Sequence, residues 1–345
     1  MSFIRRILTL SIAIVIPIWA DDGGMKKEPK DRPDYAESAR SGALWVSPDD
    51  IQTRNLLYGS GGERREPHGN TFTFEKEDMH GSNPKMDVRD SDGVKWKLKL
   101  GTEPRPETAA SRLLWAAGYF TTDDYLVKDA RIEELPVSLR RGRDLIGPGG
   151  EVHDVRLKRN PEGYEKAGTW RWKQDPFEGT REYNGLRVMM ALINNWDLKD
   201  ENTEILDRKK KDASGPDEIY LVSDLGSSFG TTAFGFYYVQ RKGQLDWYRR
   251  SRFATKVTPE YVDFSTPGFP PLLFFFSLKE YFTRASEHWI GRRVPRSDAK
   301  WIGGILAQLS HEQICDAFRA GGFSPDEVEG FAAVVEQRIG VLSRL

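Results

Sequence analysis

The sequence predicts a two-lobed α+β fold, with a strand-rich first half and a mostly helical second half. In the first half, apolar and polar residues alternate as they do in strands with one buried face. From Leu278 onward the apolar residues recur at helical spacing, and capping signatures at Ser310 and Ser324 mark helix starts. A chain of 345 residues, of which 38% are hydrophobic, is long enough for one large bilobal domain with a substantial core.

Composition excludes some classes of protein. The formal net charge is −1 with 30% charged residues, so nothing draws the whole chain to nucleic acid, and we expect no nucleic-acid partner. The single cysteine, Cys315, cannot form an internal disulfide, and its apolar helical context predicts a small core residue. The five histidines are scattered and none has the spacing of metal ligands, so we expect no zinc site.

The N-terminus has the composition of a secretory signal peptide. Two arginines precede a short apolar run at 7–16, Pro17 breaks that run, and Ala20 stands just before two aspartates. The run is too short to span a membrane comfortably. We therefore expect residues 1–20 to be removed and residues 21–42 to form a flexible leader. The mature chain would be periplasmic or secreted from a bacterium, with no stable membrane span.

The strand-rich lobe is predicted over residues 43–130. Strand-like pieces at 71–74 and 85–89 are followed by a Ser-Asp-Gly turn and by clean alternation over 94–100. In that last piece the apolar residues face one way and three lysines face the other. A helix follows at 106–118, with proline at its first position and glycine at its end.

The second lobe is predicted over residues 181–345, after an irregular connecting segment of extended linker and strand pieces at 131–180. A helix over 184–194 leads into the polar stretch NNWDLKDENTEIL at 194–206, where the first of two short strands begins. The apolar run FPPLLFFFS at 269–277 is short, and we expect it to be core and not membrane.

Five polar residues occur in the order that phosphoryl transfer from ATP requires. They are a strand lysine, a helix glutamate, a loop aspartate, an asparagine five residues later and an aspartate after the second strand: Lys99, Glu107, Asp197, Asn202 and Asp224. The lysine would place the phosphates and the glutamate would hold that lysine. The loop aspartate would orient or accept the proton of an acceptor hydroxyl. The asparagine and the last aspartate would hold Mg²⁺ or Mn²⁺.

The spelling of these motifs resembles that of protein kinases. DLKDEN at 197–202 resembles the catalytic loop of eukaryotic-type protein kinases, and Asp-Leu-Gly at 224–226 resembles their Asp-Phe-Gly. The His-Arg pair that precedes the aspartate in those kinases is replaced by Asn195 and Trp196. An Asn-x-Asp with a second asparagine five residues after the aspartate is similar to the HipA-type kinases instead.

Two further pieces resemble the HipA-type kinases. HGSNPKMDV at 80–88 is similar to their Ser-Gly-x-Gln-x-Lys loop, and ETAASRLLWAAG at 107–118 is similar to their Glu-bearing helix. The resemblance extends in ordered pieces from about 80 to 230, and at this level it is to the wider protein-kinase-like clan, which includes lipid and secretory-pathway kinases. It implies a bilobal protein-kinase-like fold that binds ATP with Mg²⁺ or Mn²⁺ between the lobes. The implied catalytic residues are Asp197 and Lys99, the metal ligands are Asn202 and Asp224, and the nucleotide contacts are Lys99, Glu107, Gly81, Ser82 and Lys85.

Two choices stay open in the sequence. Lys95, Lys97 and Lys99 share one face of a strand, and we prefer Lys99 because it is the last of them. A glycine-rich stretch at 59–62 also offers backbone N–H groups to phosphates, and we prefer the loop at 80–85.

The sequence supports four hypotheses about function. The first is an exported ATP-dependent phosphotransferase whose acceptor is a hydroxyl of a protein Ser or Thr, a sugar or a lipid head group. The second is a nucleotide-binding pseudokinase or scaffolding protein of the cell envelope, since ATP is scarce outside the cytoplasm. The third is a nucleotide transferase on the same fold. The fourth is a structural envelope protein in which the motifs are accidental.

Overall fold

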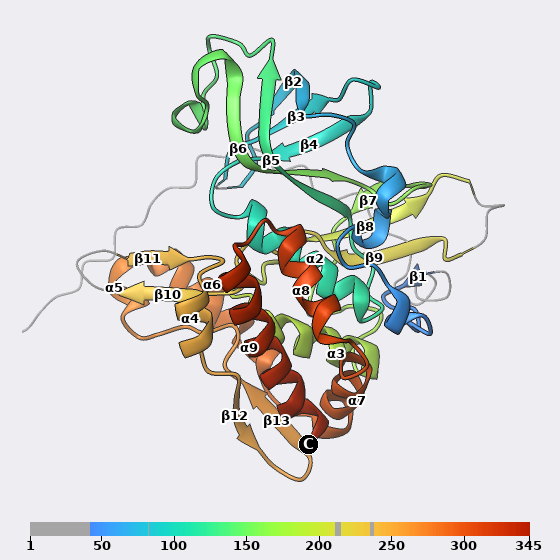
Figure 1. Cartoon of the computed structure of the whole chain (residues 1–345). Helices are drawn as coiled ribbons and strands as arrows, with labels where there is room; N and C mark the ends of the chain where they lie inside the picture. Colours follow the sequence, from blue (N-terminus) through green and yellow to red (C-terminus); the bar gives the residue numbers. More distant parts are fainter. Residues whose placement is uncertain (1–41, 82, 211–214, 235–237) are drawn as a thin grey trace, which may run out of the picture.

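The computed structural model describes residues 42–81, 83–210, 215–234 and 238–345. Figure 1 shows a strand-rich lobe at the top and a helical lobe below it. The two-lobed α+β fold predicted from the sequence is therefore confirmed. The predicted signal peptide and Ser82 lie outside the described residues. The predicted leader at 21–42 does too, except for its last residue, Gly42.

The first lobe is a closed five-stranded barrel. Its strands are β2 (Thr71–Asp78), β3 (Lys85–Arg89), β4 (Lys95–Lys99), β5 (Asp123–Glu133) and β6 (Glu151–Arg159). They close in the order β2-β3-β4-β6-β5, and all neighbours are antiparallel except the parallel pair β2 and β5. Val88, Trp96 and Leu98 are buried inside the barrel, so the lysines that alternate with them on β4 lie on its outer face.

Strand β6 lies within residues 131–180, where we expected linker and strand pieces. It pairs with both β4 and β5, and these residues therefore complete the barrel. The strand is hard to recognise from sequence because Asp154 interrupts its alternation with a positive φ of 47°. Val152 and Val155 are both buried although they are three residues apart.

Helix α2 (Pro104–Ala116) lies between the barrel and the helical lobe (Figure 1). It packs against β5 and β6 on one side and against α8 (His311–Ala320) on the other, so most of its residues are buried. The chain leaves the helix at Gly118, where φ is +96° and an added Cβ would lie 2.3 Å from the carbonyl oxygen of Val46. This agrees with the helix predicted over 106–118, which begins two residues earlier than expected.

A second sheet lies below the barrel (Figure 1). Its strands are β1 (Gly42–Ala43), β9 (Glu218–Val222), β8 (Thr203–Arg208) and β7 (Tyr164–Gly168), hydrogen-bonded in that order. Strands β8 and β9 are the two short strands predicted after the polar stretch. Because β7 follows β6 directly, residues 160–163 carry the chain from the barrel to this sheet.

The helical lobe is built around α3 (Arg181–Leu192), which packs against α7 (Arg296–Leu306) and α9 (Pro325–Ser343). The predicted capping boxes at Ser310 and Ser324 are both present, at the starts of α8 and α9. The smaller elements of this lobe are β10 (Thr231–Phe234), β11 (Tyr238–Arg241), α4 (Leu245–Arg250), β12 (Ala254–Val257), β13 (Tyr261–Phe264), α5 (Leu273–Phe276), α6 (Leu278–Glu287) and β14 (Val294–Pro295).

The apolar run at 269–277 is not core, contrary to our expectation. Leu273 is buried, but Phe274, Phe275 and Phe276 are exposed, with Phe275 at 80%. A single turn of helix presents only one side to the rest of the lobe, so a continuous apolar run leaves its other side chains outside. Within the described ranges, no helix combines the length and the apolar character needed to cross a bilayer.

Candidate active site

Lys99 ends β4 and its ammonium group lies among three carboxylates. Its Nζ is 2.7 Å from Glu107, 2.9 Å from Glu103 and 3.1 Å from Asp224, and the lysine is 1% exposed. Burial opposes the charge of Lys99, but Asp224, Glu107 and Glu103 outweigh it and raise the lysine's pKa above its ordinary value. The structure thus brings together three of the predicted site residues, from β4, α2 and the turn after β9.

The carboxylate of Glu107 is itself held by a residue that sequence reasoning missed. Arg156 on β6 donates from Nη1 to Oε1 of Glu107 at 2.7 Å, and it lies 3.7 Å from Asp124. Burial raises the pKa of Glu107 above its ordinary value, although the positive charges of Arg156 and Lys99 act to lower it. No sequence signal marks Arg156, because it lies on the strand whose alternation is interrupted.

Glu103 is a second carboxylate that the sequence did not single out. It also pairs with Lys242, so it joins Lys99 to the segment after β11. An added Cβ at Gly226 would lie 2.5 Å from Cβ of Glu103, so this close approach requires glycine at the third position of Asp-Leu-Gly. The backbone N–H of Gly226 also donates to Asp224 at 3.3 Å, which helps to orient that carboxylate.

The predicted catalytic loop is anchored at its start by two asparagines. Asn194 has a left-handed backbone (φ +52°), donates to the carbonyl of Gly230 and accepts from Thr266 at 2.6 Å. Asn195 is buried, and its side-chain oxygen accepts from the backbone N–H of Asp197 at 3.0 Å. These bonds position Asp197 at the start of the loop, where the sequence places it in DLKDEN.

The far end of the loop joins Asp197 to the Asp-Leu-Gly turn. The side-chain amide of Asn202 donates to the carbonyl of Asp197 at 2.8 Å. The carbonyl of Asn202 accepts from the N–H groups of Ser223 at 2.8 Å and Asp224 at 3.3 Å. Lys199 lies 2.6 Å from a carboxylate oxygen of Asp197. The loop therefore keeps the predicted proton acceptor and both predicted metal ligands in one hydrogen-bonded unit.

Two cavities meet at this unit, with volumes of about 1020 Å³ and about 990 Å³. Both lie near the upper end of the range of about 300–1,000 Å³ that is typical of ligand sites. The first is also lined by Lys99 and Glu107, and the second by Asp197 and Lys199. The residues that line both are Gly81, Lys85, Glu201, Asn202 and Asp224. A phosphoryl group could therefore pass between a donor in one cavity and an acceptor in the other.

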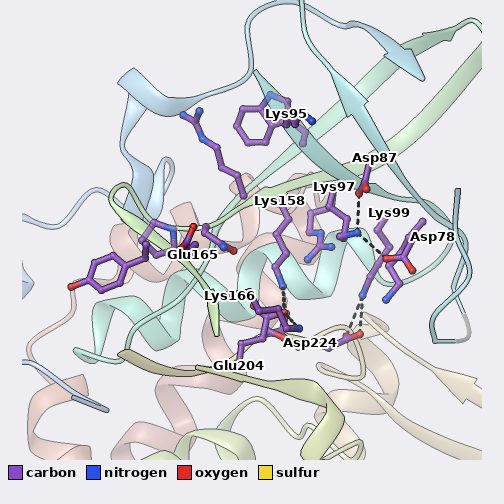
Figure 2. A pocket seen from close by; sticks show the side chains of 18 of the residues that line it. Asp78, Asp87, Lys95, Lys97, Lys99, Lys158, Glu165, Lys166, Glu204 and Asp224 are labelled. Carbon is purple, nitrogen blue, oxygen red and sulfur yellow. Dashed lines mark hydrogen bonds and ion pairs between the residues drawn. The ribbon is translucent and has the colours of Figure 1, made fainter. Parts of the chain in front are cut away.

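Figure 2 shows the first cavity, where the three candidate lysines of β4 lie differently. Lys95 is 65% exposed and pairs loosely with Glu75. Lys97 lies 2.8 Å from both Asp78 and Asp87. Of the three, Lys99 is the lysine that reaches the carboxylates of α2 and of the Asp-Leu-Gly turn, in keeping with our preference from the sequence.

The predicted phosphate loop lies at the junction of the two cavities. Gly81 has a φ of +71°, and an added Cβ there would come within 3.3 Å of Nζ of Lys85. Among the described residues Lys85 has no carboxylate within 4.0 Å, and burial and the charge of Lys99 lower its pKa. The alternative stretch at 59–62 lines neither cavity and packs against Arg112 and Tyr125 instead.

The donor atoms at the junction fit a magnesium ion. The side-chain oxygen of Asn202 has no hydrogen-bond partner among the described residues, and the carboxylate of Asp224 lies beside it on the shared wall. Amide and carboxylate oxygens are the ligands that Mg²⁺ prefers. The carboxylates of Glu103, Glu107 and Asp224 also cluster within 4.8 Å around the ammonium of Lys99. Glu103 and Glu107 are at most 6% exposed, whereas Asp224 is 30% exposed and lines both cavities, so Asp224 is the one of the three that can also reach a metal ion.

The second cavity contains a buried carboxyl that the sequence did not indicate. Glu287 ends α6, and one of its oxygens is buried without a hydrogen-bond partner in the described structure. Burial, reinforced by the nearby charge of Asp197, raises the pKa of Glu287 to about 8. At neutral pH this carboxyl is therefore protonated beside the predicted catalytic loop.

The fold and the site together define a bilobal kinase-like α+β protein. A barrel with one helix stands over a helical lobe, a buried lysine–glutamate pair lies between them, and an Asp–Asn loop faces an Asp-Leu-Gly turn. These are the parts that position ATP and metal in kinases.

Comparison with known proteins adds little to this description. No family model matches the chain, and no curated protein sequence matches it. Among solved structures, the crystal structure of a Helicobacter pylori proinflammatory kinase, CtkA, is similar with a TM-score of 0.38 and 11% sequence identity. The similarity covers 80% of this chain and 97% of that chain. At these values no residue role is transferred from CtkA, and the resemblance to HipA-type kinases stays a prediction.

Proposed function

We propose that the protein is an exported, metal-dependent phosphotransferase that moves the γ-phosphoryl group of ATP to a hydroxyl acceptor. The acceptor would be a protein Ser or Thr, a sugar or a lipid head group. The observation that carries this proposal is the buried ammonium of Lys99, held 2.7 Å from Glu107 and 3.1 Å from Asp224 on the wall of a ligand-sized cavity. Phosphoryl transfer depends mainly on such fixed positive charge near the phosphates.

Each residue has a distinct part in the proposed reaction. Lys99 neutralises phosphate oxygens in the first cavity, and Lys85 offers a second positive charge where the cavities meet. Asp197 faces the second cavity and accepts the proton of the acceptor hydroxyl. Although burial opposes it, Asp197 raises the pKa of Lys199, which therefore stays charged next to the aspartate. A magnesium ion held by Asn202 and Asp224 would supply charge neutralisation when bound.

The test uses the chain from Asp21 with Asp197→Asn and Asp224→Asn variants. Thermal stability is measured with ATP, with and without Mg²⁺, and γ-labelled ATP is incubated with candidate acceptors in parallel. We expect a metal-dependent rise in the unfolding midpoint and transfer of label. Transfer should be lost in both variants, and the metal dependence should be lost in Asp224→Asn. The exposed Lys95→Met serves as the matched control and should behave as the unmodified chain does.

One observation favours a second candidate, a nucleotide-binding pseudokinase or scaffolding protein. The wall of the first cavity carries Glu204, which pairs with Lys166 at 3.1 Å and Lys158 at 3.6 Å. Burial opposes the charge of Glu204, but the two lysines hold its pKa below the ordinary value. Such charged pairs on the cavity wall can bind a charged ligand such as a nucleotide without supplying a catalytic group. Metal-dependent ATP binding without transfer of label to any acceptor, while the fold is intact, would favour this candidate.

Export is part of the proposal and has its own test. The motif order at residues 1–20 supports it, with two arginines, a short apolar run and Ala20 before an acidic pair. The full-length chain is expressed in a bacterium, and the N-terminus of the protein recovered from the periplasm or the medium is sequenced. We expect a start at or near Asp21. Recovery of the uncut chain from the cytoplasm alone would contradict export.

A further inference from the structure

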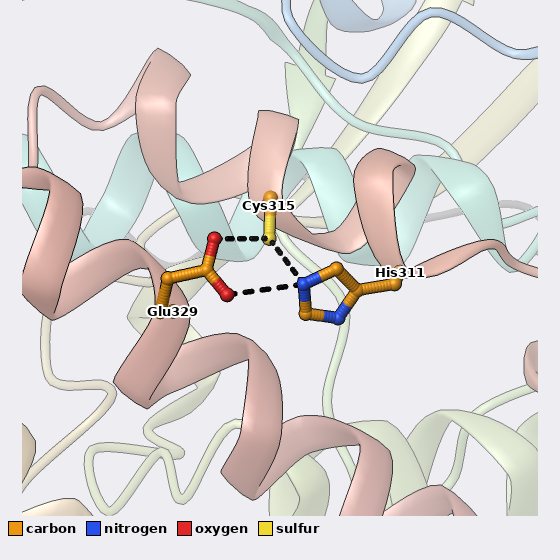
Figure 3. A group of neighbouring side chains, drawn as sticks. All are labelled: His311, Cys315 and Glu329. Atoms are coloured by element: carbon orange, nitrogen blue, oxygen red, sulfur yellow. Dashed lines mark hydrogen bonds and ion pairs between the residues drawn. The ribbon is translucent and has the colours of Figure 1, made fainter.

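A group of three potential metal ligands lies in the helical lobe and lines neither cavity. His311 and Cys315 are four residues apart on α8, so they share one face of that helix. Glu329 on α9 faces them across the contact between the two helices (Figure 3). The side chains of His311 and Glu329 are 50% and 61% exposed, so solvent reaches these two ligands, whereas Cys315 is buried behind them.

One ligand atom from each of the three residues lies within 4.8 Å of the other two, which is close enough for a shared metal ion. Nε2 of His311 lies 3.4 Å from Sγ of Cys315 and 3.1 Å from Oε2 of Glu329, and Sγ lies 3.8 Å from Oε1 of Glu329. Zinc bonds of about 2.0–2.3 Å at tetrahedral angles require separations of about 3.6, 3.4 and 3.6 Å. The distances from Nε2 to Sγ and to Oε2 agree with these to within about 0.3 Å. The contact of Sγ is to the other carboxylate oxygen, Oε1, so a rotation of the Glu329 carboxylate would bring one oxygen to both neighbours.

The second nitrogen of the imidazole is held as it is in zinc proteins. Nδ1 of His311 lies 2.9 Å from Oε1 of Glu336, which stands two helical turns after Glu329 on α9. A histidine that binds a metal through Nε2 commonly donates its other N–H to a carboxylate, which fixes the tautomer and the ring orientation. Glu336 is an independent feature of the group, because it contacts the histidine on the side away from Cys315.

Contrary to our expectation of no zinc site from the sequence, we propose that His311, Cys315 and Glu329 bind one Zn²⁺ ion, with Glu336 as the positioning residue of the histidine. Nitrogen, thiolate sulfur and carboxylate oxygen together suit zinc better than Mg²⁺ or Ca²⁺. Binding replaces the proton on Nε2 and the proton on Sγ, while Glu329 contributes its carboxylate unchanged. Two protons therefore leave for each Zn²⁺ that binds, and a water molecule completes the four ligands.

Without metal, the group balances its charges through the histidine. Both ring nitrogens of His311 lie within hydrogen-bond distance of a carboxylate oxygen, Nδ1 at 2.9 Å from Glu336 and Nε2 at 3.1 Å from Glu329, so a proton on each nitrogen holds the ring between the two carboxylates. Burial, together with Glu329, raises the pKa of the Cys315 thiol to about 11. The metal must displace this proton. The bound metal would join α8 to α9. Helix α8 also packs against α2, the helix that carries Glu107.

The test measures Zn²⁺ itself on the purified full chain and does not depend on the proposed phosphotransferase. Equilibrium dialysis against micromolar Zn²⁺, followed by metal analysis, should find one ion per chain. His311→Ala, Cys315→Ser and Glu329→Gln should each lose that ion, and Glu336→Gln should bind it roughly 10–100-fold more weakly. Zn²⁺ should also raise the unfolding midpoint of the unmodified chain and not that of the three ligand variants.

Two controls make the outcome decisive. His153→Ala removes an exposed histidine that also pairs with a carboxylate, Asp129 at 2.8 Å, but has no cysteine beside it, and it should keep the ion. Substitution of Zn²⁺ by Co²⁺ should produce the absorption of a cobalt–thiolate bond, absent in Cys315→Ser. If Cys315→Ser fails to fold, the exposed positions 311 and 329 decide. Substoichiometric Zn²⁺ on the unmodified chain, full binding by His311→Ala, or Co²⁺ binding without a thiolate band would each overturn the proposal.

Discussion

Arg156 donates a hydrogen bond to Glu107 across 2.7 Å, so the carboxylate that holds Lys99 is itself held from strand β6. All three side chains are at most 2% exposed. Charges removed from water in this way are stable only as a compensated set, because each partner offsets the desolvation of the next. Strand β6 therefore supplies the positive charge of Arg156, which completes this set of compensated charges.

The first prediction concerns that charge. Arg156→Met should lower the free energy of unfolding by about 3–5 kcal/mol, because it leaves Glu107 buried with less positive charge than it needs. Urea denaturation measures the change. Arg131→Met is the matched control, since Arg131 pairs with Glu151 at 3.5 Å with both side chains half exposed. It should cost no more than about 1 kcal/mol, and equal losses in the two variants would show that the buried contact is not special.

The second prediction separates two lysines that stand one pleat apart on β4. Lys99→Met should weaken metal-dependent ATP binding by roughly 10–100-fold, the value of one or two charge-assisted hydrogen bonds. Lys97→Met should change it by less than about threefold, because Lys97 pairs with Asp78 and Asp87 instead. Calorimetric titration with ATP and Mg²⁺ measures both. If Lys97→Met weakened ATP binding more than Lys99→Met does, the nucleotide would bind at Lys97 and not at Lys99.

The third prediction tests the close approach at Asp-Leu-Gly. Gly226→Ala should reduce phosphate transfer and cost about 1–3 kcal/mol of stability, because its Cβ would meet Glu103 at 2.5 Å. Gly304→Ala is the control, because Gly304 lies in α7 and an added Cβ there meets nothing within 4 Å. That change should stabilise the chain by roughly 0.5–1 kcal/mol. Thermal unfolding of both variants checks the pair, and a neutral Gly226→Ala would contradict the packing described here.

The fourth prediction is a pH dependence. Folding raises the pKa of Glu287 from 4.5 to about 8, chiefly through burial. The folded protein therefore binds more protons than the unfolded chain between these two values, and Glu287 lowers the free energy of unfolding as pH rises from 4.5 to about 8. Glu287→Gln removes this loss, so at pH 8 the variant should be more stable than the unmodified chain by roughly 1–3 kcal/mol.

Denaturation at pH 5 and pH 8 checks this dependence. The gain from Glu287→Gln should be present at pH 8 and small at pH 5, where the glutamate is protonated when folded and partly so when unfolded. Glu151→Gln, a substitution at an exposed glutamate of the barrel, is the control and should give no comparable gain. A Glu287→Gln variant that is less stable at both pH values would mean that the carboxyl makes a contact which the amide cannot.

Local patterns in the sequence predicted the fold class and several residues of the site. Alternation over 94–100 predicted that Trp96 and Leu98 face one way and Lys99 the other, and in the structure the first two lie inside the barrel and Lys99 on its outer side. Capping boxes located the starts of α8 and α9. The order of Lys99, Glu107 and Asp224 along the chain predicted three side chains that do meet. Their roles in catalysis stay predictions.

What the sequence determined by itself is therefore what repeats within one element: which faces are buried, where helices start and which residue types occur in which order. Only the tertiary structure decided which groups touch across elements. Arg156 reaches Glu107 from a different strand, and His311 and Cys315 on α8 meet Glu329 of α9. Such contacts depend on strand register and helix packing, which the whole core sets, and a spacing along the chain does not encode them.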